Sequence, residues 1–423
     1  MRLTDPHVSE SDGGPVTPAS LRFDPFDADY LRSPYALLAS LRSSEPVFYS
    51  PDLKSWVVTR YETLRNILRD PQRYSARIAS DPIKPLCPMA RTIIQNSNFN
   101  VPPLLVNNDP PEHTRLRRFM AGPLNAARVQ SLEAGLRASV SALVDRMLAG
   151  TAPADLVRAL TWEVPALVLF ELIGIPVSDM ERVKGWASSR VVMTWGRPSD
   201  EEQVRLAKGA VEYYDYACEL VKSKVANPGD DYTSDLIRQR AGADANATLH
   251  EITVNIFNLL FAGHETTSNA AANMFLTLLS SPERWQAVCD GKTPIAQVVE
   301  EALRYDSPVH AWHRRAKEDV ELDGQKIPAG SRLLMVMAAG NRDPERFESP
   351  DDFCPGRAAG NQHLAFGMGI HSCLGAPLAR RELAVMLETL SARAPGLRLV
   401  PGQLLEYTPN TSLRGFRELQ VAW

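Results

Sequence analysis

The sequence has few cysteines, no block of like charges and no long apolar run. Its five cysteines lie far apart without a Cys-x-x-Cys pair, which disfavours a disulfide framework and favours a reducing cytoplasmic location. The formal net charge of −4 comes without the basic stripe of nucleic-acid-binding proteins, so we expect no nucleic-acid partner. No stretch reaches the roughly 18 apolar residues of a membrane span, so we expect no membrane attachment.

The distribution of predicted elements favours one mainly α domain with a minor β region. Residues 1–22 are polar and predict a disordered arm, which precedes a single domain at residues 23–423. Helical periodicity dominates residues 113–303, and a proline-rich irregular loop is expected at residues 83–111. A short helix is predicted at residues 34–42, and strands at residues 45–49, 56–61, 320–322, 331–337 and 397–400.

The longest predicted helix covers about residues 248–280, with apolar residues at helical spacing. At about 1.5 Å rise per residue, it is roughly 50 Å long and crosses a whole domain. Its middle, Ala262–Thr267, reads AGHETT, although Gly and Thr are poor helix formers and a buried Glu is costly. Such a local conflict with the surrounding fold points to a functional site.

The strongest local signal is the segment Phe366–Gly375, which reads FGMGIHSCLG. Its glycines permit a tight turn before Cys373, which stands at the start of a predicted helix over residues 376–389. The free N–H groups and positive dipole end of a helix N-terminus lower a thiol pKa and favour a thiolate metal ligand. Three further positions are expected to face a flat cofactor or shield the sulfur: Phe366, Gly367 and Gly375.

Other interpretations of these residues are weaker. A lone cysteine is most often a small buried hydrophobic residue. A zinc site could be drawn from Cys354, His363, His371 and Cys373, but their spacings do not match the usual zinc-finger patterns. The glycine pair lacks the third glycine of a dinucleotide-binding fingerprint, and the His-Glu pair at residues 264–265 does not continue to His-Glu-x-x-His.

The same segment resembles the haem-binding signature of the cytochrome P450 family, Phe-x-x-Gly-x-(Arg/His)-x-Cys-x-Gly. Every fixed position is matched, by Phe366, Gly369, His371, Cys373 and Gly375. The resemblance implies the family fold, a triangular helical prism with a long central I helix and small β-sheets. It also implies heme b (iron protoporphyrin IX) as the cofactor and Cys373 as the ligand of its iron.

A predicted ion pair joins Glu301 and Arg304, which share a helix face at i and i+3. Such a pair alone is usually a surface feature. In the family, an arginine that follows a Phe-x-Pro segment completes this pair, and Arg357 matches it. The resemblance therefore implies a structural cluster beneath the Cys373 loop.

A second set of residues matches positions that bind the haem propionates in the family. His113 and Arg117 share a helix face at i and i+4, and a solvated basic face is the plain alternative. Arg314 matches a further family propionate ligand, although Arg315 is adjacent and the assignment could shift by one. His371 completes the set, and arginine suits carboxylates because its fork binds them with two hydrogen bonds.

The AGHETT segment resembles the family motif for dioxygen chemistry. The small residues Ala262 and Gly263 are expected to let dioxygen and substrate lie against the helix. Thr266 and Glu265 are the expected catalytic residues, which deliver protons for cleavage of the O–O bond. On a generic buried helix, Thr266 would instead bond its own backbone.

The expected substrate pocket includes Asn258, Val309 and Thr411. The resemblance implies a haem-thiolate monooxygenase that inserts one atom of O2 into a small organic substrate. Segments 45–51, 56–62, 195–198 and 409–412 are most similar to the haem domain of self-sufficient P450s fused to a phthalate-dioxygenase-type reductase. That similarity suggests hydroxylation or oxidative O-/N-dealkylation of a small aromatic or xenobiotic molecule.

Electrons are expected from a separate ferredoxin and an NAD(P)H-dependent ferredoxin reductase, because the sequence ends at Trp423 without a flavin or nicotinamide domain. Two interpretations are open for four arginines near Cys373: a basic docking face for the electron donor, or plain solvation. These are Arg115, Arg118, Arg380 and Arg381. The alternative function is a P450-fold ligand binder or peroxide-driven oxidase. The Glu265–Thr266 pair favours the monooxygenase, since a binder needs no proton relay.

Overall fold

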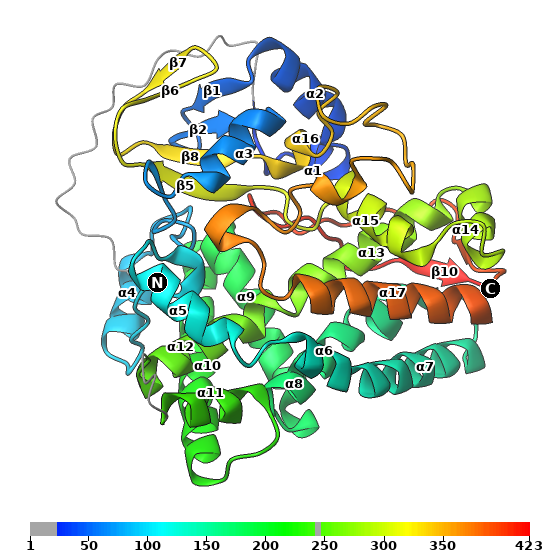
Figure 1. The fold of residues 1–423 in the computed structure, drawn as a ribbon, viewed down its shortest axis with the longest axis horizontal. Coiled ribbons are helices and arrows are strands. Elements are labelled where there is room, and N and C mark those ends of the chain that lie inside the picture. The colour runs from blue at the N-terminus through cyan, green and yellow to red at the C-terminus, as the bar shows by residue number, and fades with distance from the viewer. Residues whose placement is uncertain (1–22, 242–246) are drawn as a thin grey trace.

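The computed structural model describes residues 23–241 and 247–423, so the arm predicted at residues 1–22 lies outside the described residues. Helices form most of the described chain, and a smaller region rich in strands lies at the top of the view in Figure 1. The predicted fold class, mainly α with a minor β region, is confirmed.

The helices follow one another with short connections. The α-helices are α1 (Ala28–Arg32), α2 (Tyr35–Ser44), α3 (Tyr61–Arg69), α4 (Pro88–Gln95), α5 (Glu112–Ala121), α6 (Ala126–Ser131), α7 (Glu133–Ala149), α8 (Glu163–Ile173), α9 (Met180–Trp195), α10 (Asp200–Ala226), α11 (Tyr232–Arg240), α12 (Leu249–Ala262), α13 (Glu265–Leu279), α14 (Pro282–Cys289), α15 (Ile295–Tyr305), α16 (Met337–Gly340) and α17 (Ala376–Arg393). Short helical turns are η1 (Leu105–Asn107), η2 (Val157–Thr161), η3 (Val177–Asp179), η4 (Gly360–Gln362) and η5 (Gly369–His371).

The strands form small sheets. The largest described sheet has the order β1-β2-β8-β5-β3, in which β2 and β8 are parallel and the other neighbours antiparallel. A second sheet has the order β4-β10-β9, and β6 and β7 form a hairpin. The strands are β1 (Val47–Ser50), β2 (Ser55–Val58), β3 (Tyr74–Ser75), β4 (Ala154–Asp155), β5 (Trp312–Ala316), β6 (Val320–Leu322), β7 (Gln325–Ile327), β8 (Arg332–Met335), β9 (Arg398–Leu399) and β10 (Gln420–Ala422).

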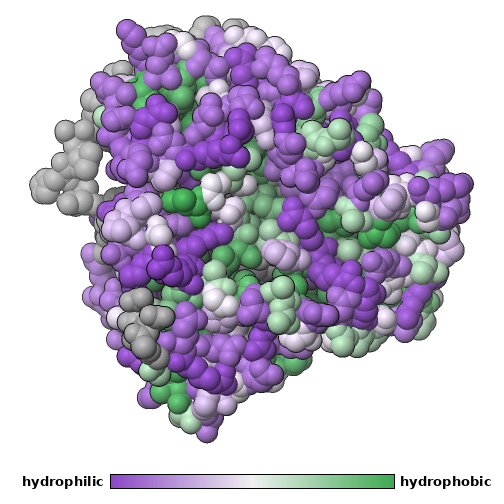
Figure 2. Space-filling view, in the orientation of Figure 1, coloured by the Kyte–Doolittle hydropathy of each residue, from purple (hydrophilic) through white to green (hydrophobic). Residues whose placement is uncertain are grey.

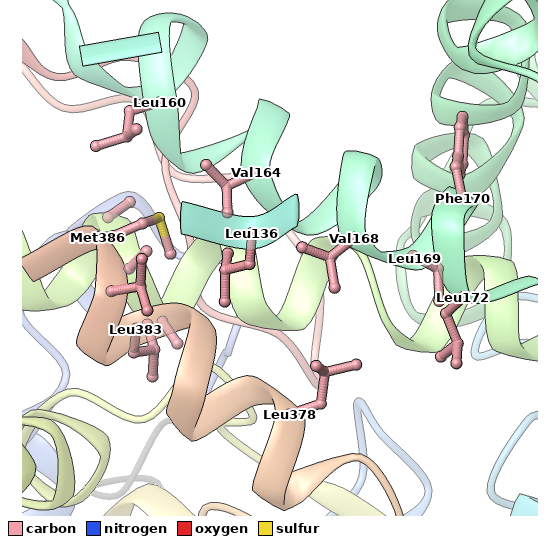
Figure 3. Close-up of a cluster of buried hydrophobic side chains, with 14 of the residues drawn as sticks. Leu136, Leu160, Val164, Val168, Leu169, Phe170, Leu172, Leu378, Leu383 and Met386 are labelled. Carbon is pink, nitrogen blue, oxygen red and sulfur yellow. The ribbon is translucent and has the colours of Figure 1, made fainter. Parts of the chain in front are cut away.

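The main hydrophobic core joins α7, α8 and α17, with η2 beside them (Figure 3). Leu136 of α7, Val164 of α8 and Leu383 of α17 are almost fully buried in it. Full burial of a leucine stabilises the fold by about 1.5–3 kcal/mol. This core fixes α17, whose N-terminus follows the Cys373 loop, against the helices on the lower side of Figure 1.

Three predicted elements differ from the structure. The central helix predicted at residues 248–280 is two helices, α12 and α13, because the chain turns at Gly263 and His264 between them. The loop predicted at residues 83–111 contains α4, which begins with proline at a position where its missing N–H costs nothing. The strand predicted at residues 331–337 ends at Met335, and α16 follows it.

The outer surface in Figure 2 is mostly polar, with apolar residues gathered mainly towards the middle of the view. Within residues 23–241 and 247–423, no helix combines the length and the apolar character needed to cross a membrane.

Candidate active site

The Cys373 loop is shaped by glycines in the left-handed region. Gly367 has φ 63° and Gly369 has φ 70°, a conformation that L side chains rarely adopt. A Cβ on Gly369 would lie 2.5 Å from the Leu68 carbonyl oxygen, so α3 packs directly on this backbone. The Cys373 N–H donates to the Phe366 carbonyl at 2.8 Å and closes the loop. The sequence predicted this turn from its glycines.

The sulfur of Cys373 faces the backbone N–H groups of Gly375 and Ala376, as expected at the start of α17. Burial raises the pKa of the Cys373 thiol and outweighs the lowering by these N–H groups and by Arg117. The N–H groups at the start of α17 lower the thiol pKa as expected, but burial makes the net shift of the pKa upward. A bound metal cation deprotonates a coordinating thiol regardless.

Phe366 and Gly375, at the two ends of the Cys373 loop, differ in their surroundings. The Phe366 ring lies 4.5 Å from the Arg380 guanidinium, on the side where it covers the loop. A Cβ on Gly375 would lie 3.9 Å from the Cys373 sulfur, an ordinary contact. Room for a flat cofactor at Gly375 stays a prediction.

Among the described residues, no group of three His, Cys, Asp or Glu side chains is placed to hold a metal ion. His363 instead lies 3.4 Å from Glu300. The zinc interpretation of Cys354, His363, His371 and Cys373 therefore has no geometric basis.

The predicted propionate ligands gather from separate elements. The rings of His113 (α5) and His371 (η5) lie 4.1 Å apart, and both are buried or half-buried. Arg117 donates to the Ser372 carbonyl at 2.6 Å, which ties α5 to the Cys373 loop. Arg314 is 3% exposed and close enough to lower the pKa of both histidines.

This cluster is rich in donors and poor in acceptors. Neither ring nitrogen of His113, nor Nε2 of His371, has a hydrogen-bond partner among the described residues. Burial, with nearby arginines, lowers the pKa of His113 to about 4 and that of His371 to about 2. Burial also lowers the pKa of Arg314 to about 10. Buried polar groups without partners cost free energy, so the cluster suits an anionic ligand such as the haem carboxylates.

The structure decides between the neighbouring arginines of β5. Side chains alternate along a strand, so Arg314 and Arg315 point to opposite faces. Arg314 faces the two histidines, whereas Arg315 acts on Arg332. The geometry therefore favours Arg314.

The predicted ion pair on α15 is buried and complete. Arg304 donates twice to Glu301, at 2.9 and 2.8 Å, and Arg357 donates to the same carboxylate at 3.2 Å. The Cys354 N–H adds a bond of 2.7 Å. Burial acts to raise the pKa of Glu301, but Arg304 outweighs it and the pKa lies below its ordinary value. Arg304 also donates to the carbonyls of Asn341, Pro350 and Asp352.

The distal acid and alcohol, Glu265 and Thr266, are the first two residues of α13, directly after the break that follows α12. The Thr266 hydroxyl donates to the Ala262 carbonyl at 2.8 Å, which leaves its oxygen lone pairs able to accept. Glu265 is 7% exposed, and its Oε2 has no partner among the described residues. Burial raises the pKa of Glu265 to about 8, so the side chain holds a proton at neutral pH.

The neighbours of this pair hold the break in place. His264 contacts the Trp162 carbonyl at 2.9 Å through Nε2. A Cβ on Gly263 would lie 2.9 Å from a methyl carbon of Leu169, so α8 packs against this position. The small residue at 263 lets α8 pack closely against the break, and the expected room for dioxygen and substrate stays a prediction.

The expected pocket residues lie around one region. Val309 and Ala262 pack in an apolar cluster with Phe261, Trp195 and Leu413. Thr411 is 2% exposed, with its hydroxyl 3.5 Å from His313 Nε2.

Asn258 accepts a hydrogen bond of 3.3 Å from Arg190 of α9. Arg190 was not singled out from the sequence. On an amphipathic helix, an arginine is usually solvated, and its burial depends on α10 and α12 packing against α9.

The arginines considered for a docking face are mostly paired within the chain. The ion pairs are Arg115 with Glu112 and Glu251, Arg380 with Glu300, and Arg381 with Glu133. Their charge is offset locally, so the structure gives a basic docking face little support.

The chain is similar to known haem enzymes along nearly its whole length. A family model described as Cytochrome P450 matches residues 179–290 and 295–391. Cytochrome P450 monooxygenase PikC of Streptomyces venezuelae is 36% identical over 418 residues, 97% of this chain and 96% of that protein.

Two solved structures carry the similarity into three dimensions. Cytochrome P450 CREJ in complex with (4-ethylphenyl) dihydrogen phosphate has a TM-score of 0.92 and 36% identity, over 95% of this chain and 99% of that chain. An intact type IV self-sufficient cytochrome P450 monooxygenase has a TM-score of 0.92 and 36% identity, over 97% of this chain and 54% of that chain. The predicted resemblance to self-sufficient P450s is confirmed.

The residues present fit the haem that the family binds. An unpartnered donor cluster stands on one side of the Cys373 loop, and the sulfur faces N–H groups at the start of α17. The relatives are named as monooxygenases, which supports oxygen insertion and not the binder or peroxide-driven alternative. The chain is therefore a haem-thiolate monooxygenase of the cytochrome P450 family.

Proposed function

We propose that this monooxygenase hydroxylates, or oxidatively O- or N-dealkylates, a small aromatic substrate. The observation that carries the proton chemistry is Glu265, a buried acid with a pKa of about 8 that directly precedes Thr266 at the break of the central helix. One solved neighbour supports an aromatic substrate, since it holds (4-ethylphenyl) dihydrogen phosphate.

The proposed cofactor is heme b, whose iron Cys373 would hold and whose propionates His113, Arg117, Arg314 and His371 would bind. When bound, the haem supplies the iron centre at which dioxygen is reduced and split. The unpartnered nitrogens of both histidines support this arrangement, because propionate oxygens would satisfy them. Arg117 would bind a propionate while it holds the Ser372 carbonyl.

Glu265 and Thr266 have different roles in proton delivery. At neutral pH the protonated Glu265 carboxyl is the reservoir, since its pKa lies near 8. The Thr266 hydroxyl is oriented by its bond to the Ala262 carbonyl, so its oxygen can accept a hydrogen bond from a water that carries the proton of Glu265 to the distal pocket. His264 and Leu169 fix the backbone at the break and so hold both groups in register.

A separate ferredoxin and an NAD(P)H-dependent ferredoxin reductase are the proposed electron donors. Cytochrome P450 monooxygenases use electrons from redox partners, which supports this proposal. A cytoplasmic location is proposed as well, because all five cysteines are free thiols.

The proposed function is tested first by the reduced protein's carbon monoxide difference spectrum. A strongly red-shifted Soret band is expected from the thiolate, and Cys373→Ser should abolish it. Isotope-labelled dioxygen, with surrogate ferredoxin and reductase, should then place one labelled atom in the product of a neutral aromatic ether such as 4-methylanisole. A histidine-type band would overturn the assignment of Cys373, and an unlabelled product would overturn the reaction.

Thr266→Ala separates oxygen insertion from simple electron flow. We expect NAD(P)H consumption to continue while most of the reducing equivalents appear as hydrogen peroxide, because proton delivery loses its last step. Thr277→Ala, a buried threonine three turns further along α13, is the matched control. Unchanged coupling in Thr266→Ala would contradict the proposed role.

A further inference from the structure

Arg190 is a half-buried arginine with a fully buried Nη1, and no carboxylate of the described chain balances its positive charge. Its guanidinium lies 4.6 Å from the centre of the Phe257 ring and 5.0 Å from that of Phe261, both on α12. One nitrogen, Nη2, donates to the Asn258 side chain at 3.3 Å. The other, Nη1, has no partner among the described residues.

Within residues 23–241 and 247–423, no carboxylate lies within ion-pair distance of Arg190. The titratable group that acts on it is Tyr213 of α10, whose buried hydroxyl also lacks a partner among those residues. Apart from Arg314, which is assigned to a haem propionate, the buried arginines of the described chain have acid partners, such as Arg304 with Glu301 and Arg414 with Asp306. Taking a cation out of water without a partner is costly, so its retention points to a negative group supplied from outside.

The space beside Arg190 is a pocket with the composition of an anion site. The residues that line it include three aromatic residues, Trp186, Tyr213 and Phe257, and three hydroxyl residues, Ser80, Ser189 and Thr194. The Ser189 hydroxyl already donates to the Gly185 carbonyl at 2.9 Å, which leaves its oxygen as an acceptor. Hydroxyl groups can donate to an oxyanion, and a guanidinium binds carboxylate or phosphate with two parallel hydrogen bonds. The rings suit a flat apolar body attached to that anion.

The position of Arg190 sets the length of the ligand. Its partner Asn258 precedes Ala262 by one helical turn, roughly 6 Å along the helix axis, and Ala262 accepts from the Thr266 hydroxyl. An anion at Arg190 therefore leaves about one small ring's length to the distal acid and alcohol.

We infer that the substrate is a small aromatic molecule with a carboxylate or phosphate group, held by Arg190 and Tyr213 at the α9–α12 end of the pocket. This rests on the proposed monooxygenase function and narrows its substrate class. Arg190 acts as a specificity residue: it orients the ring so that the end opposite the anion faces Thr266. The anion remains bound through the reaction, and oxygen is inserted at that far end.

The test measures binding of matched ligands to the haem-loaded enzyme by titration calorimetry and by the Soret spin-state shift. The probes are 4-methylbenzoate, 4-methylphenyl phosphate and the neutral 4-methylbenzamide. The two anions distinguish a carboxylate from a phosphate site. In the wild type, at least one anion should bind about tenfold or more tightly than the amide.

Variants assign the preference to this site. Arg190→Gln should weaken the preferred anion by about tenfold or more and leave the amide nearly unchanged, while Arg190→Lys should lose less and Tyr213→Phe less still. Arg205→Gln is the control, since Arg205 lies on the neighbouring helix α10 but is exposed beside Glu202. It should change neither ligand.

Equal wild-type affinity for anions and amide would overturn the inference. So would Arg190→Gln variants that lose both ligands equally. Failure of the proposed function is seen separately, in the carbon monoxide spectrum and in oxygen insertion into neutral 4-methylanisole. Calorimetric anion binding at Arg190 does not depend on either of those results.

Discussion

Two buried glutamates, Glu301 on the Cys373 side and Glu265 in the central helix, stand in opposite electrostatic environments. Glu301 receives bonds from Arg304, Arg357 and a backbone N–H, which hold its pKa below the ordinary value. Glu265 has no donor on Oε2 among the described residues, and burial raises its pKa to about 8. The same side chain is a fixed charge in one place and a proton store in the other, because its neighbours differ.

Removing the charge of Glu301 should have the largest effect on stability. Glu301→Gln leaves Arg304 and Arg357 buried without a negative partner, so we expect a loss of about 3–5 kcal/mol in the free energy of unfolding. Denaturant unfolding and the ratio of haem to protein absorbance would measure it. Glu62→Gln, in an exposed pair with Arg65, should cost under about 1 kcal/mol. A stable, haem-loaded Glu301→Gln protein would contradict the structural role.

Removing the acid group of Glu265 should affect turnover. Glu265→Gln removes the proton store, and we expect oxygen insertion to slow by about 100-fold. In the wild type, activity should fall as pH rises through about 8, because Glu265 loses its proton there. Pre-steady-state decay of the dioxygen complex across pH 6–10 is the readout. Glu265→Asp should restore part of the rate, and a pH-independent wild-type profile would rule out Glu265 as the reservoir.

The arginines near Cys373 provide a second comparison. Arg304 has an acid partner within the chain, whereas Arg314 is proposed to bind a haem propionate. Arg314→Leu should speed haem transfer to apomyoglobin by about tenfold, because one propionate loses a charge-assisted bond. Arg315→Leu is the matched control, on the opposite face of β5. Equal rates for both variants would mean that neither arginine is a propionate ligand.

The smallest expected effect is a gain in stability from Glu265→Gln, opposite in sign to the loss expected from Glu301→Gln. The folded-state pKa of Glu265 lies above the unfolded value, so the protonated acid costs little below about pH 4.5 and the fold loses stability as pH rises towards 8. Glu265→Gln removes that cost and should stabilise the protein at pH 8 by on the order of 1–3 kcal/mol. Unfolding of both proteins at pH 5 and pH 8 checks it: the difference should shrink at the lower pH.

The stability from Glu301 follows the other direction. Its folded-state pKa is lowered, so its contribution is present above the unfolded value and is lost as pH falls through the folded value. At low pH the wild type should therefore lose the stability that the Glu301 ion pairs contribute on the Cys373 side. Glu265 is protonated under those conditions and should not destabilise the fold.

The sequence by itself determined the parts of this protein that depend on short spacings. The Cys373 loop, the pair Glu301–Arg304 and the adjacent Glu265–Thr266 are each contained within ten residues or fewer, and local backbone geometry places them. Left-handed glycines shape the loop, and one helical turn joins the ion pair. These features also carried the family resemblance.

Only the tertiary structure decided features that depend on packing between distant segments. Burial by other helices raises the pKa of Glu265, and the pairing of β5 with β8 turns Arg314 towards His113 and His371. The position of Arg190 between aromatic rings requires α9, α10 and α12 together. Desolvation and long-range charge follow from three-dimensional neighbours, and a linear pattern does not contain them.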